Sequence, residues 1–181
     1  MNKTLLSAAM IAGFGVAAFA PQAASAAGGD GIITFAGKVV ANTCTFSVNG
    51  GAANATVTLP VVFTSTLAAA GQVAGTTPFT IAVAGCDTNL TSVQELFSGT
   101  NIAADGNLTN TAATNKVEVQ LLNGTTNAVI NMNSSNGSAT SPVANLASGG
   151  VTLSYKAQYF ATGVSTSGIV STSVTYTTSY L

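Results

Sequence analysis

Hydrophobic and polar residues alternate with a period of two along much of the chain, in short runs rich in Val, Thr, Ile, Phe and Tyr. Side chains of an extended chain point alternately to opposite faces, so this period is typical of β-strands with one buried face. Clusters of Gly, Asn, Ser and Thr separate the runs. The runs predict strands at Thr34–Val40, Cys44–Val48, Thr56–Leu59, Phe79–Val83, Val93–Phe97, Lys116–Leu122, Ala128–Met132, Val151–Ala161 and Ile169–Tyr180.

Asn-Gly dipeptides predict turns, because both residues tolerate positive φ. They occur at Asn49-Gly50, Asn123-Gly124 and Asn136-Gly137, and the second lies between two strand-like runs, where it predicts a β-hairpin. Leu67–Ala70 could form a short helical turn, and the polar segment Thr88–Asn115 is poorly periodic outside its brief strand. Many short antiparallel strands without a linker or repeat indicate one β-sandwich.

The first residues have the pattern of a secretory signal peptide. Lys3 precedes an apolar run at residues 5–20, and Ala24-Ser25-Ala26 forms a small-x-small cleavage site. An N-terminal membrane anchor is the alternative, but the run is short for a span. We expect cleavage after Ala26, which leaves 155 of the 181 residues, enough for one domain with a core. No later stretch is long and apolar enough to span a membrane, so we expect an exported chain.

Charges are sparse, and their pattern excludes several partners. The chain has four Lys and Arg residues, five Asp and Glu residues and no His, for a net charge of −1. Without a basic cluster we expect no nucleic-acid partner. Few charges together with 47% hydrophobic residues favour aggregation of an isolated chain. This composition suits a protein that assembles.

The residues for catalysis or cofactor binding are also missing. Without His the chain lacks the commonest general base and metal ligand. Asp87 and Glu95 are eight positions apart, Asp105 is isolated, and no GxSxG or SxxK motif occurs. We therefore expect no enzyme activity, no cofactor and no metal site. In an exported chain the even pair Cys44 and Cys86 predicts a disulfide rather than a metal or redox pair.

The C-terminal run Gly168–Leu181 alternates along its whole length. The face with branched and aromatic residues, expected to point inward, carries Gly168, Val170, Thr172, Val174, Tyr176, Thr178 and Tyr180. Nothing follows Leu181 to pair with the far side of this strand, and an unpaired apolar edge is an aggregation hazard. A covering strand must come from earlier in the chain or from another molecule.

A second alternating face lies near the mature N-terminus. Ile33, Phe35, Gly37 and Val39 share one side of an extended chain. Three of these positions are apolar, and the third in order, Gly37, has no side chain. The arm is either this domain's own first strand or a strand for a neighbour.

These features in order resemble the pilins of the chaperone–usher pathway, in particular the major shaft subunit of type 1 fimbriae. The resemblance rests on the signal peptide, the arm with its internal Gly, GKVVANTC, Leu59-Pro60, Gly75, Pro78-Phe79, Cys86, LSYKAQYFATG, and a last strand with Gly168 fourteenth from the end and Tyr180 penultimate. It spans nearly all of the mature chain. The segment Thr88–Asn115 is its least familiar part.

The resemblance implies an incomplete immunoglobulin-like β-sandwich that lacks its final strand. Residues 27–40 would form the donor-strand arm and residues 41–181 the pilin domain. By donor-strand exchange the face Ile33, Phe35, Gly37 and Val39 would fill the groove of the next subunit, with Gly37 where the groove is shallow. A periplasmic chaperone would bind the groove edge and the terminal carboxylate, at Gly168, Val170, Val174, Tyr176, Tyr180 and Leu181.

The expected function is that of a structural subunit of a bacterial surface fimbria that supports cell adhesion. Its partners would be identical or homologous pilin subunits, the periplasmic chaperone and the outer-membrane usher, and export through the periplasm would place it at the cell surface. Two alternatives stay open: a minor adaptor or tip subunit of such a fibre, and a monomeric secreted binding module. A two-domain adhesin would need a separate lectin domain, for which the chain is too short.

Overall fold

The computed structural model describes residues 34–37, 39, 44–112, 114–135 and 138–181. The predicted signal peptide, Ile33 and the turn at Asn136-Gly137 lie outside these residues. The strands are β1 Thr45–Val48, β2 Val73–Ala84, β3 Ser92–Ser98, β4 Val117–Asn123, β5 Ser138–Thr140, β6 Ala144–Asn145, β7 Val151–Ala161 and β8 Thr175–Tyr180, with 3₁₀ turns η1 Thr64–Leu67 and η2 Met132–Ser135. The chain divides into two units, Met1–Lys38 and Val39–Leu181.

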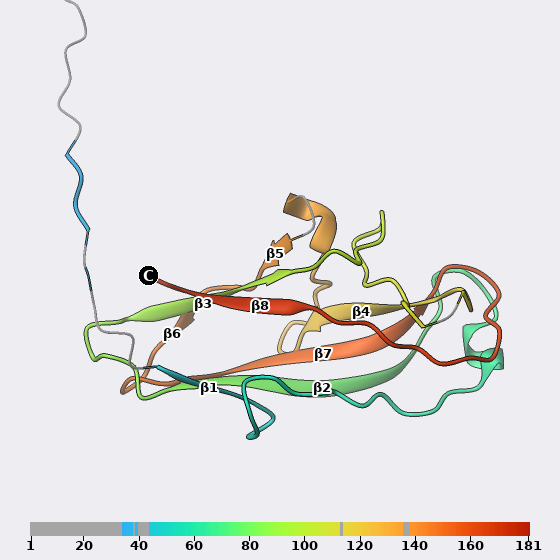
Figure 1. The fold of residues 1–181 in the computed structure, drawn as a ribbon, viewed down its shortest axis with the longest axis horizontal. Coiled ribbons are helices and arrows are strands. Elements are labelled where there is room, and N and C mark those ends of the chain that lie inside the picture. The colour runs from blue at the N-terminus through green and yellow to red at the C-terminus, as the bar shows by residue number, and fades with distance from the viewer. Residues whose placement is uncertain (1–33, 38, 40–43, 113, 136–137) are drawn as a thin grey trace, which may run out of the picture. The chain divides into compact units, whose positions relative to one another are not determined.

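The second unit is a sandwich of two antiparallel sheets (Figure 1). One sheet has the strand order β1-β2-β7-β4, and its longest ladder joins β2 to β7. In the other sheet β3 pairs with β5 and β6 and also with the last strand, β8. This arrangement is the β-sandwich that the strand pattern predicts, and it agrees with the incomplete immunoglobulin-like sandwich that the resemblance implies.

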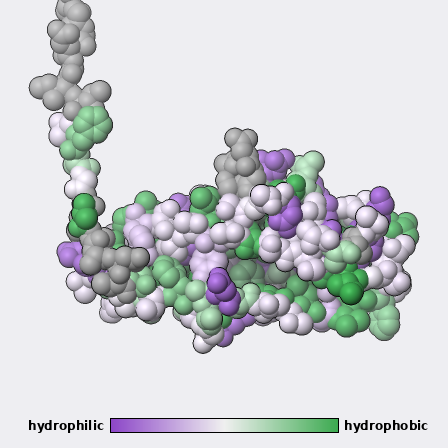
Figure 2. Space-filling view, viewed as in Figure 1, coloured by the Kyte–Doolittle hydropathy of each residue, from purple (hydrophilic) through white to green (hydrophobic). Residues whose placement is uncertain are grey.

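The core lies between the sheets and follows the alternation seen in the sequence. Strand β7 buries Leu153, Tyr155 and Ala157. Strand β2 buries Phe79 and Ile81, which point into the same core from the same face of that sheet. The Tyr155 ring stacks on that of Phe79 at a centroid distance of 5.5 Å and meets the Phe97 ring of β3 edge-on at 5.0 Å. The face seen in Figure 2 mixes hydrophobic residues with many of intermediate hydropathy and a few hydrophilic ones.

Strands that bury one face match their predicted positions. The bounds of β7 are those expected, β1, β3 and β4 agree within one or two residues, and β2 extends beyond Phe79–Val83. Three segments within the predicted strands do not form a strand, and each lacks a partner strand among the described residues. Thr56–Leu59 and residues 169–174 form no strand, and neither do the described residues of Thr34–Val40. An extended segment needs a neighbour for its backbone groups before it becomes a strand.

Two local predictions need correction. The chain does reverse after β4, where the backbone N–H of Asn127 donates to the carbonyl of Asn123, but Ala128–Met132 forms only an isolated bridge, Leu122 to Val129. Gly124 takes no positive φ; its backbone approaches Ser154 so closely that an added Cβ would lie 2.6 Å from the Ser154 carbonyl carbon. The helical turn begins earlier than expected, at Thr64, and ends at Leu67.

Asn49-Gly50 behaves as predicted, because both residues have positive φ, 50° and 75°. The poorly periodic segment Thr88–Asn115 contributes more than β3. Leu108 is buried in the core and forms a bridge with Val119, with hydrogen bonds in both directions between their backbone groups. This bridge covers part of the outer edge of β4.

Candidate functional site

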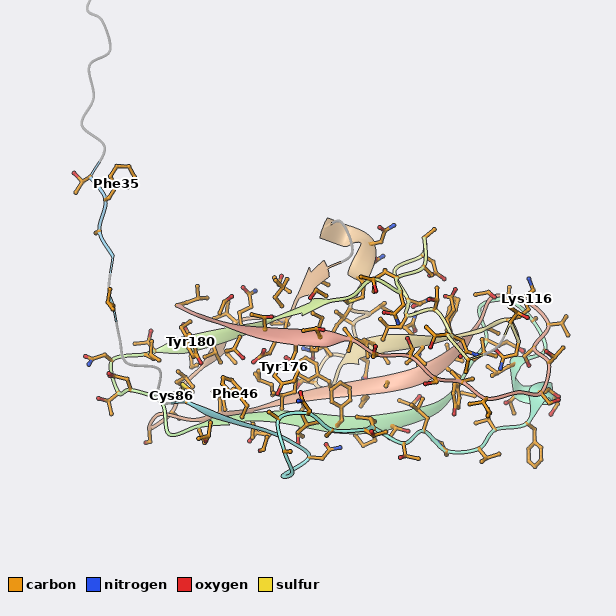
Figure 3. The ribbon with its side chains drawn as sticks, viewed as in Figure 1. Phe35, Phe46, Cys86, Lys116, Tyr176 and Tyr180 are labelled. Carbon is orange, nitrogen blue, oxygen red and sulfur yellow. A yellow bond between two sulfur atoms is a disulfide. The ribbon has the colours of Figure 1, made fainter. Side chains whose placement is uncertain are left out.

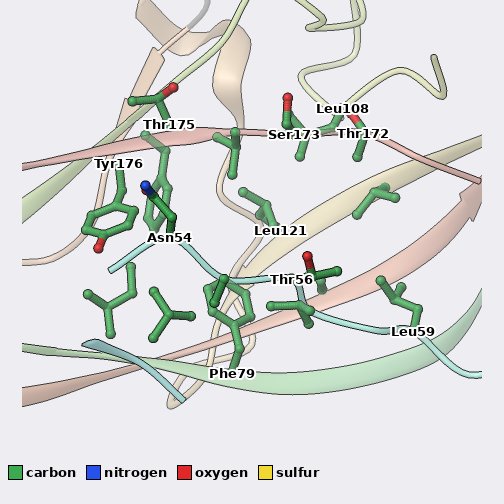
Figure 4. A pocket seen from close by; sticks show the side chains of 18 of the residues that line it. Asn54, Thr56, Leu59, Phe79, Leu108, Leu121, Thr172, Ser173, Thr175 and Tyr176 are labelled. Atoms are coloured by element: carbon green, nitrogen blue, oxygen red, sulfur yellow. The ribbon is translucent and has the colours of Figure 1, made fainter. Parts of the chain in front are cut away.

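An open groove of about 810 Å³ runs along one side of the sandwich (Figure 4). Its two rims are the extended segment 53–59 and residues 170–178, which come from distant parts of the chain. Its floor is the core itself, formed by Phe46, Val48, Phe79, Ile81, Phe97, Leu108, Val119, Leu121, Ala157 and Tyr159. The sandwich is therefore unfinished on this side.

The first rim was predicted as a strand but not as part of a site. Within the described residues, the backbone of residues 54–59 makes no hydrogen bond. Val57 and Leu59 point inward and are only partly buried against the core, while Thr56 and Thr58 are exposed. The alternation of Thr and apolar residues in this segment was the available signal for a rim.

The second rim is the C-terminal strand and the residues before it. Val170, Val174 and Tyr176 pack against the core but stay partly exposed, because nothing covers them from the groove side. The backbone N–H of Leu181 donates to the Ser92 carbonyl at 3.0 Å. In an antiparallel ladder alternate residues bond to the partner, so the odd-numbered residues of β8 bond to β3. The even-numbered residues present their backbone groups to the groove.

The predicted edge residues are not all in the groove. Val170, Val174 and Tyr176 line it, whereas Gly168, Tyr180 and Leu181 do not. The Tyr176 hydroxyl donates to the Ala53 carbonyl at 2.9 Å and so joins the two rims. The labelled side chains of Tyr176 and Phe46 (Figure 3) both belong to the lining.

The end of the chain is tied to the start of β3. The Leu181 carbonyl oxygen lies 3.1 Å from the Thr91 hydroxyl and 3.4 Å from the Ser92 hydroxyl, both of which donate to it. The Leu181 side chain is 59% exposed. The terminal carboxylate is accordingly held in place while its side chain faces solvent.

Two apolar residues of the predicted arm, Phe35 and Val39, lie among the described residues and are exposed. Phe35 is 91% exposed and Val39 is 100% exposed. A Cβ built on Gly37 meets no heavy atom within 4 Å. Single exposed apolar side chains are common on protein surfaces, so it is the alternation of apolar residues with Gly37 on one side of this segment that makes it a candidate strand for another surface.

Cys44 and Cys86 form a disulfide, with their Cα atoms 4.2 Å apart. Cys44 directly precedes β1, and Cys86 follows the end of β2 by two residues. Since β1 and β2 pair from Thr45–Ala84 to Val48–Ile81, the disulfide closes the open end of this ladder.

One buried carboxylate lies next to the second rim. Glu95 points inward from β3 and is fully buried, directly opposite Thr178 in the register with β8. Its carboxylate oxygens lie 2.8 and 2.9 Å from the Thr178 hydroxyl, which donates to them. Loss of hydration raises the pKa of Glu95, and the Thr178 hydrogen bond offsets only part of that rise.

Two further carboxylates, Asp105 and Glu118, lie close together. Asp105, which the sequence suggested was isolated, lies beside Glu118, and burial followed by the Asp105 charge raises the pKa of Glu118. Both Asp105 oxygens already accept hydrogen bonds from Asn107. Among the described residues no three His, Cys, Asp or Glu side chains are grouped to hold a metal ion.

Comparison with known proteins agrees with this geometry. Residues 33–180 match the family model described as fimbrial protein. The chain belongs to the fimbrial protein family. It is 41% identical over 160 residues to the F17 fimbrial protein of Escherichia coli, covering 83% of this chain and 87% of that protein. It is 39% identical over 169 residues to the major fimbrial subunit SMF-1 of Stenotrophomonas maltophilia (strain K279a), covering 90% of this chain and 98% of that protein.

The fold of this fimbrial subunit also matches solved structures. A structure of a chaperone–usher pilus aligns with a TM-score of 0.61 at 21% identity, covering 85% of this chain and 97% of that chain. The fold is therefore that of a chaperone–usher pilus subunit, while the family match and the two relatives confirm the resemblance to fimbrial subunits. Fimbrial subunits of this kind are exported to the cell surface. Within the described part of the chain, no helix is both long enough and apolar enough to span a membrane.

Proposed function

We propose that this fimbrial subunit polymerises by donor-strand exchange, in which the arm of one copy fills the groove of the next. The observation that carries the proposal is the groove itself: two rims with unused backbone groups flank an uncovered core. The arm offers the complementary feature, an apolar face on an extended segment. A strand inserted between the rims would gain hydrogen bonds on both of its edges.

The dimensions of arm and groove are compatible. The edge from Val170 to Thr178 would be about 27 Å long as a strand, and an arm strand from Ile33 to Val39 would be about 20 Å long, both at about 3.4 Å per residue. Covering each large apolar side chain contributes roughly 1.5–3 kcal/mol. Because the whole strand must leave together, the filled groove should release it slowly.

The chain has both an arm and a groove, which suits a subunit that repeats along a fibre. A chain with an arm and a groove can donate to one neighbour and accept from another, which growth of a polymer requires. A subunit at the tip of the fibre needs only one of these functions, a monomeric binding module needs neither, and an adaptor within the fibre needs both, as a shaft subunit does. We therefore favour a structural, non-catalytic subunit that contributes to adhesion as part of the fibre.

Before assembly the open groove needs another partner. A chain with uncovered apolar residues would aggregate in the periplasm, so we propose that a periplasmic chaperone lends it a strand along β8 and that an outer-membrane usher receives the complex. The even-numbered backbone groups of β8 and the anchored carboxylate of Leu181 are the features that such a chaperone would bind.

A peptide exchange experiment tests the proposal. The subunit in complex with its chaperone is mixed with a synthetic peptide covering Asp30–Val40, and native mass spectrometry follows the species present. We expect the peptide to replace the chaperone and form a stable one-to-one complex, whereas a peptide of the same composition in scrambled order does not. A subunit that never takes up the arm peptide and stays monomeric without its chaperone would contradict the proposal.

A further inference from the structure

The groove edge continues beyond the strand that supports it. Strand β8 pairs with β3 only from Tyr180 to Thr175, where the partner strand ends at Ser98. Residues 170–173 nevertheless line the groove, and they belong to no strand. Something other than β3 must hold this part of the rim in an extended form.

The polar segment supplies that support through Asn110. Its side-chain Oδ1 accepts from the Ser171 backbone N–H at 2.9 Å, and its Nδ2 donates to the Ile169 carbonyl at 2.9 Å. A carboxamide has the same donor and acceptor as a peptide group. Asn110 therefore bonds to this segment as a residue of a neighbouring strand would.

Thr111 completes the same contact. Its backbone N–H and its hydroxyl both donate to the Ser171 carbonyl, each at 2.9 Å. Asn110 is itself fixed, because its Nδ2 also donates to the Oδ1 of buried Asn115 at 3.0 Å and its Oδ1 accepts from the Ala112 N–H at 3.0 Å. The rim thus rests on a braced side chain.

These contacts set which backbone groups face the groove. In an extended chain the N–H and C=O of successive residues point to opposite edges. Since Ile169 and Ser171 bond to the polar segment, the even-numbered residues Val170 and Thr172 point the other way. Their backbones make no hydrogen bond within the described residues, and their side chains are half-buried while those of their neighbours are exposed. The even-numbered residues of β8 also face the groove, so the two parts form one edge.

We propose that Asn110, aided by Thr111, is a positioning residue that extends the acceptor edge from β8 back to Val170 for the arm of a second copy of this chain. The inference rests on the proposed donor-strand function and adds a role for the polar segment. Without Asn110 the segment would lose its bonds at the Ile169 carbonyl and the Ser171 N–H, and it would keep those that Thr111 donates to the Ser171 carbonyl and Asn101 to the Thr172 hydroxyl. The firmly held edge would then shorten toward the six residues of β8, Thr175–Tyr180, and an arm strand would bond mainly to β8 at this rim.

Hydrogen exchange of single backbone amides tests the role of Asn110. The chain from residue 27 is refolded at low concentration and given excess arm peptide, Asp30–Val40. In the unchanged subunit we expect the peptide to protect the amides of Val170 and Thr172 as well as those of Tyr176 and Thr178. In Asn110→Ala only the second pair should be protected, and the peptide should dissociate about tenfold faster.

Asn133→Ala is the matched control, because Asn133 also donates its side-chain amide to a backbone carbonyl, that of Ala104, away from the rim. It should behave like the unchanged subunit. Should Asn110→Ala fail to fold, Asn110→Asp keeps the acceptor for Ser171 but loses the donor for Ile169, and it should show the same local loss of protection. If a folded Asn110 variant shows full protection of the Val170 and Thr172 amides and releases the peptide at the unchanged rate, the role of Asn110 is wrong while the donor-strand function still stands. No protection in the unchanged subunit would overturn donor-strand uptake as well.

Discussion

A substitution at Gly37 is the most direct test of the proposed fit between arm and groove. Its neighbours on the same face, Phe35 and Val39, carry bulky side chains, while Gly37 leaves a gap between them. We expect the gap to lie over a shallow part of the groove floor, so that the two backbones approach closely.

We predict that a Gly37→Leu arm peptide displaces the chaperone far more slowly than the unchanged peptide, because overpacking costs roughly 1–3 kcal/mol. Ala36→Leu is the control: it adds the same side chain to the opposite face and should exchange normally. Stopped-flow or native mass spectrometry gives both rates. Equal rates for the two variants would mean that the gap has no such purpose.

Glu95 is the other residue whose chemistry sets a measurable property. A hydroxyl has one hydrogen, so Thr178 can serve only one carboxylate oxygen at a time. The rings of Tyr155, Tyr176 and Tyr180 also lie near enough for the Glu95 charge to raise the pKa of each, in every case after the larger effect of burial. The cause of the raised pKa of Glu95 itself is burial, which disfavours its charged form, and the Thr178 hydrogen bond acts against that effect.

We predict that this carboxyl makes the subunit less stable as the pH rises. Burial raises the pKa of Glu95 in the folded chain above its ordinary value of 4.5. Stability from the bound proton is then fully present below that ordinary value and is lost as the pH rises through the folded pKa. Glu95→Gln should remove this dependence and gain roughly 1–3 kcal/mol at neutral pH relative to the unchanged chain.

Urea unfolding at a series of pH values from 3 to 8 measures the effect. The curves of the unchanged subunit and Glu95→Gln should meet at acid pH and separate toward neutral pH. Thr178→Val removes the hydroxyl that donates to the Glu95 carboxylate, so a subunit with this change should lose more stability between acid and neutral pH than the unchanged subunit does. Parallel curves over the whole range would show that Glu95 ionises as easily in the folded chain as in the unfolded one.

At the scale of elements, the last strand carries both the groove edge and the chain end. The backbone of Leu181 is bonded to Ser92, and Tyr180 lies opposite Val93, so these two residues fix the end of β8 against β3. We predict that removing Tyr180 and Leu181 abolishes capture by the periplasmic chaperone and leads to degradation of the subunit.

Co-purification with a tagged chaperone measures this capture directly. Ser179→Ala, which changes an exposed side chain of the same strand, should leave it intact. A truncated subunit that still co-purifies at the normal level would show that the chain end is not needed for capture.

The elements also show how far the sequence alone predicts this fold. β7 was predicted residue for residue because it is paired on both edges and buries one face, so its alternation reflects its surroundings. Thr56–Leu59 and residues 169–174 have the same alternation but form no strand, because no strand among the described residues pairs with them. These two segments, which were wrongly predicted as strands, lie in the two rims of the groove. The supports at Asn110 and Thr111 could not be predicted, since side-chain hydrogen bonds leave no periodic pattern.

At the scale of the whole molecule, the disulfide lies where the predicted arm joins the sandwich, so it bears on both the strength of the fibre and the stability of the subunit. In a fibre built as proposed, tension would pass from the seated arm into the body through Cys44 and β1. That strand has only four residues, Thr45–Val48, and β2 is its one partner within the described part of the chain. Four ladder pairs would peel readily from an exposed end. The bond from Cys44 to Cys86 joins the entry point directly to the end of the longer strand β2.

We predict that replacing both cysteines by Ser lowers the free energy of unfolding by about 4 kcal/mol, because the unfolded chain regains the freedom of the loop between them, 42 residues in sequence separation. The double change avoids leaving a reactive thiol. Chemical denaturation of the isolated subunit measures the loss, and a reducing agent added to the unchanged subunit should reproduce it. Assembled fibres should resist reduction better, since a filled groove holds the first rim, which follows β1 in the chain, in place. An equal unfolding midpoint with and without the cysteines would show that pairing of β1 with β2 suffices to anchor the arm.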